Sequence, residues 1–215
     1  MKKAILFDLD GTILDTILDI HQAVNIGLKT FGYDDVTVKK VKKSVGSGAM
    51  QMIALCAPSA NEVMIKNIHD TYQEAYDQNH KDLTTIYDGM LPLLKELKKK
   101  YRLGVVSNKY DHLVQSLMHH YFLNIFDAAL GMTNELPIKP APDMVLKVLN
   151  DLNVTPQDVL YIGDSEPDIL VSKKLNMDHV AVSYGYRDAE LLKGLDPMYL
   201  VKDVAALKKL LMSLI

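Results

Sequence analysis

The stretch AILFDLDGTILD (residues 4–15) places four apolar residues directly before the sequence Asp-Leu-Asp-Gly-Thr. A short and uninterrupted apolar run is typical of a strand that is buried on both faces of a sheet. Similar runs recur at 103–107, 159–163 and 179–183, with a weaker one at 128–130. The sequence therefore predicts several buried strands, of which residues 4–7 form the first.

Helical patterns separate most of these predicted strands. They cover residues 88–100, 111–120, 143–152, 167–175 and 204–214. Alternating strands and helices form parallel sheets with helices on both faces, because each crossover returns the chain to the same edge of the sheet. We therefore expect an α/β fold with a doubly wound parallel sheet.

The alternation fails between residues 15 and 84, where amphipathic helical patterns follow one another without a convincing strand. This segment is expected to form a helical insert between the first strand and the rest of the sheet. We accordingly predict a core domain of residues 1–15 and 85–215 and an inserted helical domain of residues 16–84.

Composition excludes several classes of protein. The 215 residues include 24 basic and 27 acidic side chains, a net charge of −3, without the concentrated basic face of a nucleic-acid or membrane-surface binder. The only cysteine, Cys56, lies in an apolar stretch, and an internal disulfide is impossible. The first apolar run is too short for a signal peptide or a membrane span. We expect a cytoplasmic protein, with a monomer as the default state.

Acidic side chains follow two of the predicted strands. Asp8 and Asp10 come directly after the first strand, and Asp164 follows the run at 159–163. In a doubly wound sheet, ligands bind beyond the carboxyl ends of the strands, where the strand order reverses. Clustered carboxylates at such an edge suit a small octahedral cation such as Mg²⁺.

Other residues at the same edge suit an anion. Gly11 lets the backbone turn so that amides after Asp8 can point at an anion, and Ser107 and Lys139 can complete the cradle. Acids for a metal, with amides and a cation for a tetrahedral anion, indicate phosphoryl transfer. A carboxylate such as Asp8 can be the nucleophile, while Asp10 transfers the proton.

Four segments together resemble the motifs of the haloacid dehalogenase superfamily in its phosphatase form. They are Asp8-Leu9-Asp10-Gly11-Thr12, Ser107-Asn108, Lys139-Pro140 and Gly163-Asp164-Ser165-Glu166-Pro167-Asp168. They occur in the order typical of that superfamily, and the helical insert lies where the superfamily places its cap domain. The resemblance implies a Rossmann-like core carrying a small helical cap.

The resemblance also implies a role for each matching residue. Asp8 would be the nucleophile and a metal ligand, and Asp10 the acid/base residue that binds the metal through its backbone carbonyl. Asp164 would be a direct metal ligand, and Asp168 an outer-shell acid. The residues expected to bind the phosphoryl group are Ser107 and Lys139, helped by the amides of Leu9, Gly11 and Asn108.

The implied activity is that of a Mg²⁺-dependent phosphatase acting on a small phosphorylated metabolite through an aspartyl-phosphate. Three segments look most like phosphoglycolate phosphatases, which makes phosphoglycolate the first expected substrate: residues 45–48, 107–109 and 184–186. A pyrophosphatase, a sugar-phosphate mutase of the β-phosphoglucomutase type and a catalytically silent binding protein stay open as alternatives. Such mutases usually carry an arginine where this chain has Gly48-Ala49, which counts against that alternative.

Overall fold

The computed structural model describes residues 2–214 and divides the chain into two compact units. Of the described residues, the first contains 2–14 and 86–214, and the second contains 15–85. The chain leaves the first unit at strand β2 (Leu14–Asp15) and returns at strand β3 (Thr85–Ile86), and these two strands pair.

The first unit contains a six-stranded sheet in which every pair of neighbouring strands is parallel. Its strands are β1 (Ala4–Phe7), β4 (Arg102–Tyr110), β5 (Ala128–Met132), β6 (Val159–Gly163), β7 (Asp178–Val182) and β8 (Tyr199–Val201). The strand order β5-β4-β1-β6-β7-β8 grows outward from β1 in both directions. The prediction of a doubly wound α/β fold is confirmed, and the order reverses beside β1.

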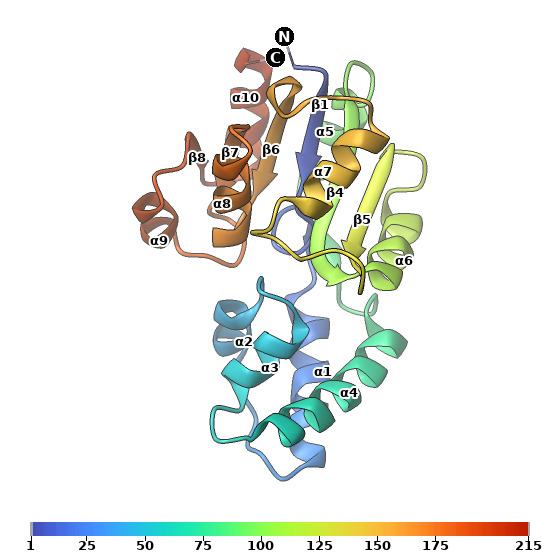
Figure 1. Cartoon of the computed structure of the whole chain (residues 1–215), viewed down its shortest axis with the longest axis vertical. Coiled ribbons are helices and arrows are strands. Elements are labelled where there is room, and N and C mark those ends of the chain that lie inside the picture. The colour runs from blue at the N-terminus through green and yellow to red at the C-terminus, as the bar shows by residue number, and fades with distance from the viewer. Residues whose placement is uncertain (1, 215) are drawn as a thin grey trace. The chain divides into compact units, whose positions relative to one another are not determined.

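Helices cover both faces of this sheet (Figure 1). They are α5 (Met90–Leu97), α6 (Asp111–Tyr121), α7 (Asp143–Asp151), α8 (Glu166–Lys174), α9 (Ala189–Gly194) and α10 (Val204–Leu214), with a 3₁₀ turn at Pro156–Asp158. Side chains of β1 alternate between two apolar clusters. Ile5 and Phe7 join residues of α5, α6 and α10, whereas Ala4 and Leu6 join residues of α7 and α8. Burial on both faces explains why residues 4–7 are uniformly apolar.

Besides the 3₁₀ turn, a helix and a strand of the first unit are absent from the sequence prediction. They are α9 and β8, which contain six and three residues. Segments this short do not complete enough periods to show a helical or strand pattern. The helix expected from residue 88 instead begins at Met90, because Gly89 precedes it with a left-handed φ of 80°.

The second unit is helical. It contains α1 (Ile17–Thr30), α2 (Val38–Ser44), α3 (Ala49–Cys56) and α4 (Glu62–Asn79). Helices α1 and α4 approach closely at Gly27, where an added Cβ would lie 2.8 Å from the carbonyl oxygen of Ile68. Among the helices of both units, across the described part of the chain, none has the length and apolar character needed to cross a membrane.

A buried carboxylate fastens the end of the second unit to its first helix. Asp19 of α1 is 2% exposed and accepts hydrogen bonds from the amides of Leu83 (2.9 Å) and Thr84 (2.8 Å). It also accepts one from the Thr84 hydroxyl (2.7 Å). Buried donors need such partners, so Asp19 fixes the segment that leads back into β3.

Replacing Asp19 with alanine is expected to destabilise the protein by about 3 kcal/mol, because three donors lose a charged acceptor. Urea unfolding followed by circular dichroism measures this change. Asp70→Ala is the matched control, because Asp70 is exposed and its ion pair with Lys66 is worth well under about 1 kcal/mol. Equal losses for the two variants would contradict the assigned role of Asp19.

Candidate active site

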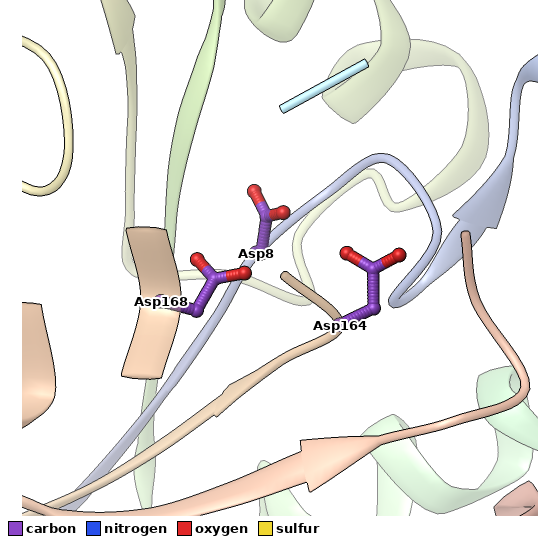
Figure 2. A group of neighbouring side chains, drawn as sticks. All are labelled: Asp8, Asp164 and Asp168. Atoms are coloured by element: carbon purple, nitrogen blue, oxygen red, sulfur yellow. The ribbon is translucent and has the colours of Figure 1, made fainter. Parts of the chain in front are cut away.

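Three aspartates meet at the carboxyl edge of the sheet. Asp8 follows β1, where its amide donates to the carbonyl oxygen of Ile162 (2.8 Å) and so extends the pairing with β6. Asp164 follows β6 directly, and Asp168 lies in the first turn of α8. Each offers a carboxylate oxygen within 4.8 Å of the others, and Figure 2 shows the three side chains projecting into the same region.

Burial makes this concentration of negative charge costly. Burial and, after it, the charge of Asp168 together raise the pKa of Asp8 to about 7, although Lys139 opposes the rise. Burial also raises the pKa of Asp164 well above its usual range, with Asp8 as the next cause. A divalent cation would relieve this repulsion, and hard carboxylate oxygens are the ligands that Mg²⁺ prefers. The residues present therefore fit such an ion.

Lys139 is buried against the same cluster. Its ammonium donates to Asp8 Oδ1 (2.9 Å), Asp168 Oδ1 (2.7 Å) and the carbonyl oxygen of Val106 (2.7 Å), and it lies 3.0 Å from the Tyr161 hydroxyl. Burial alone would lower the pKa of Lys139, but the charges of Asp168 and Asp8 raise it well above its usual value. The side chain is therefore a permanent cation beside the Asp8 carboxylate.

Both oxygens of Asp168 already have donors. Oδ2 accepts from the amide (3.1 Å) and hydroxyl (2.5 Å) of Ser165, which completes a capping box at the start of α8. Oδ1 accepts from Lys139 and, at 3.2 Å, from Tyr161. These bonds hold Asp168 against Lys139 and Ser165, so Asp8 and Asp164 are the better candidates for metal ligands.

Two glycines let the backbone close around Asp164. A Cβ on Gly11, which has φ +80°, would lie 2.3 Å from Asp164 Oδ2. A Cβ on Gly185 would lie 2.3 Å from the carbonyl oxygen of Gly11 and 2.4 Å from Asp164 Oδ2. The neighbouring amide of Tyr186 donates to that same oxygen (2.6 Å). The loop after β7 thus holds Asp164, a role that the sequence did not predict for it.

Gly11 and Leu9, whose amides are expected to bind phosphate, have different roles in the turn after β1. The amide of Gly11 donates to the carbonyl oxygen of Leu14 (2.8 Å), so it is already used inside the turn. The side chain of Leu9 is fully buried in the apolar core, which fixes the backbone between Asp8 and Asp10. Gly11 thus shapes the turn, and its predicted contact with phosphate finds no support in this geometry.

Asn108 joins two of the predicted motifs. Its side-chain oxygen accepts from the Lys139 amide (2.9 Å), and its side-chain nitrogen donates to the Lys139 carbonyl oxygen (2.9 Å). Ser107, the preceding residue of β4, is also buried. These two hydrogen bonds hold the segment that carries Lys139 against the end of β4. Asn108 therefore joins the segments of Ser107 and Lys139, the two side chains expected to bind the phosphoryl group.

Asp10 lies outside the cluster of three carboxylates. Both its oxygens accept from the ammonium of Lys109, at 3.0 Å and 2.9 Å. Lys109 and Tyr161 are residues of this site to which the sequence assigned no role. Lys109 directly follows the Ser107-Asn108 motif, and Tyr161 puts a hydroxyl inside an otherwise apolar strand, so both had a visible signal.

A family model described as haloacid dehalogenase-like hydrolase matches residues 5–182. The chain belongs to this family. The prediction of the superfamily and that of an enzyme of the hydrolase class are both confirmed.

Relatives of this haloacid dehalogenase-like hydrolase are named as phosphatases. A phosphoglycolate phosphatase from Psychrobacter arcticus is 30% identical over 216 residues, covering 96% of this chain and 94% of that protein. One from Pseudomonas putida is 27% identical over 215 residues, covering 96% and 79%. A solved structure of a candidate phosphoglycolate phosphatase from Lactobacillus delbrueckii subsp. bulgaricus matches with a TM-score of 0.91 at 31% identity, covering 97% of this chain and 98% of that one.

Replacing Gly185 with alanine is expected to destabilise the hydrolase by about 2 kcal/mol and to displace Asp164, because the new Cβ would overlap the Gly11 carbonyl and the Asp164 carboxylate. Thermal unfolding measures the first effect, and the concentration of Mg²⁺ required for a fixed rise in Tm measures the second. Gly194→Ala is the matched control, since a Cβ there meets no atom within 4 Å. An unchanged requirement for Mg²⁺ in Gly185→Ala would contradict the role given to this loop.

Stability of the metal-free hydrolase is expected to fall as pH rises from about 4 to about 7. The folded protein keeps the proton on Asp8, whose pKa is raised to about 7, whereas the unfolded chain releases it near 3.8. Mg²⁺ would bind the ionised carboxylates, so the stabilisation that it provides should grow over the same range. It should reach about 3 kcal/mol at pH 8 with Mg²⁺ at one hundred times its Kd.

Thermal melts at pH 5 and pH 8, with EDTA or with Mg²⁺, test this expectation. Asp164→Asn should remove most of the Mg²⁺-dependent gain at pH 8. A gain that is the same at both pH values, or that persists in Asp164→Asn, would show that Mg²⁺ binds elsewhere.

Proposed function

We propose that this hydrolase is a Mg²⁺-dependent phosphatase that releases phosphate from a small phosphomonoester, with phosphoglycolate as its substrate. The observation that carries the proposal is the meeting of Asp8, Asp164 and Asp168 with the buried cation of Lys139 at one edge of the sheet. The relatives named as phosphoglycolate phosphatases support this choice of substrate. A cytoplasmic location and a monomeric state stay predictions from the sequence.

The ligands proposed for Mg²⁺ are the carboxylates of Asp8 and Asp164 and the backbone carbonyl of Asp10. When bound, the ion neutralises charge on the phosphoryl oxygens and on the carboxylates around it. Lys139 and Ser107 bind the remaining phosphoryl oxygens. Lys139 is well suited to this task because the surrounding acids keep it charged, and because Asn108 fixes its backbone.

The proposed reaction has two steps. Asp8 attacks the phosphorus atom, the ester bond breaks, and Asp10 gives a proton to the departing oxygen, which leaves as an alcohol. Asp10 then takes a proton from a water molecule, which attacks the phosphorus atom of the aspartyl-phosphate and restores the Asp8 carboxylate. Each turnover consumes one water molecule and yields one alcohol and one phosphate.

The inserted helical unit is proposed to be the cap domain of the enzyme. This role rests on the resemblance to the superfamily, in which a helical insert follows the first strand. The segment 45–48 of this unit is proposed to take part in choosing the substrate.

Replacing Asp8 with asparagine is expected to lower Mg²⁺-dependent release of phosphate from p-nitrophenyl phosphate at least about 1000-fold, because the amide is a poor nucleophile. Steady-state assays with and without Mg²⁺ measure this loss. Asp151→Asn is the matched control, since Asp151 lies on the surface in an ion pair with Lys147. Retained activity in Asp8→Asn would rule out the proposed nucleophile.

The choice of substrate is tested by comparing kcat/KM for phosphoglycolate, pyrophosphate and β-glucose 1-phosphate. We expect phosphoglycolate to be preferred and phosphate to be released into solution. A preference for pyrophosphate would indicate a pyrophosphatase, and conversion of β-glucose 1-phosphate to another sugar phosphate would indicate a mutase. Absence of Mg²⁺-dependent release from any phosphate ester would favour a binding protein.

A further inference from the structure

A second buried ammonium lies in the site besides that of Lys139. The side chain of Lys109 is 5% exposed, and it contacts both oxygens of an Asp10 side chain that is 10% exposed. Lys109 belongs to β4, and its amide donates to Ser107 Oγ (3.3 Å). It therefore lies near the carboxyl end of β4, two residues beyond a side chain proposed to bind the phosphoryl group.

The two lysines lie beside different carboxylates. Lys139 contacts Asp8, which attacks the phosphorus atom in the proposed reaction. Lys109 contacts Asp10, which gives a proton to the leaving oxygen in the proposed reaction. The cation of Lys109 therefore lies on the side of the site that the proposed function assigns to the leaving group.

A buried cation of this kind suits an anionic leaving group. If the departing alcohol carries a carboxylate one carbon from its oxygen, that carboxylate must come within a few ångströms of Asp10. Two like charges at such a distance in a poorly solvated site repel each other strongly. A cation that can contact both carboxylates removes this obstacle, and Lys109 is already placed against one of them.

We propose, relying on the proposed phosphatase function, that Lys109 binds the carboxylate of the substrate's leaving group and thereby selects phosphomonoesters of 2-hydroxy acids. On binding, the ammonium exchanges one contact with Asp10 for a contact with the substrate carboxylate. The freed Asp10 oxygen can then face the ester oxygen. A neutral leaving group offers no such partner, so Lys109 keeps both oxygens of Asp10 engaged.

The test compares 2-phosphoglycolate with ethyl phosphate, in which a methyl group replaces the carboxylate. The ratio of their kcat/KM values is measured, because any general effect of a substitution on the chemistry cancels in this ratio. The wild-type protein should prefer 2-phosphoglycolate on the order of 100-fold, as expected for a charge-assisted hydrogen bond to a buried cation. Lys109→Met should reduce the preference to less than about 10-fold.

Three further variants complete the experiment. Lys109→Gln removes the charge but keeps a donor for Asp10, so it should lose the preference even if Lys109→Met fails to fold. Lys109→Arg keeps the charge and should retain most of the preference. Lys147→Met, which removes a surface lysine paired with Asp151, should retain all of it.

The outcomes separate this inference from the function on which it rests. A preference that persists in Lys109→Met and Lys109→Gln overturns the role of Lys109. Equal hydrolysis of both esters by the wild-type protein overturns the proposed selectivity but leaves the phosphatase function standing. Hydrolysis of neither ester in the presence of Mg²⁺ overturns both proposals.

Discussion

The site depends on placing three acidic side chains within reach of one another in a poorly solvated place. Asp8, Asp164 and Asp168 repel one another, and burial makes each negative charge still more costly. The fold tolerates the arrangement because the ammonium of Lys139 contacts two of the three. Much of the surrounding architecture serves this balance: Asn108 fixes the backbone of Lys139, and the capping box of α8 fixes Asp168.

The sequence predicted the parts of this arrangement that are local. The run at 4–7 is apolar because β1 is buried on both faces, and the acids directly after it indicated a site at the end of a strand. The short elements α9 and β8 were missed because they lack the length to show a period. The contacts of Tyr161 and Gly185 were beyond prediction, since they join segments that only the sheet brings together.

The two buried ammonium groups, of Lys139 beside Asp8 and of Lys109 beside Asp10, link the fold to the proposed choice of substrate. Ser107 and Lys109 belong to one strand, β4, and Asn108 between them reaches the segment of Lys139. One strand end thus touches both the region proposed for the phosphoryl group and the region proposed for the leaving group. The spacing of the two regions is therefore set by three consecutive residues near the end of β4.

The central position of β1 also affects how the chain is made. This strand is synthesised before both of its neighbours, since it pairs with β4 around residue 102 and with β6 around residue 159. A nascent chain therefore carries this apolar strand without a neighbour until β4 has left the ribosome. The helices of residues 15–85 emerge in between, and they can fold locally while that strand waits for its partners.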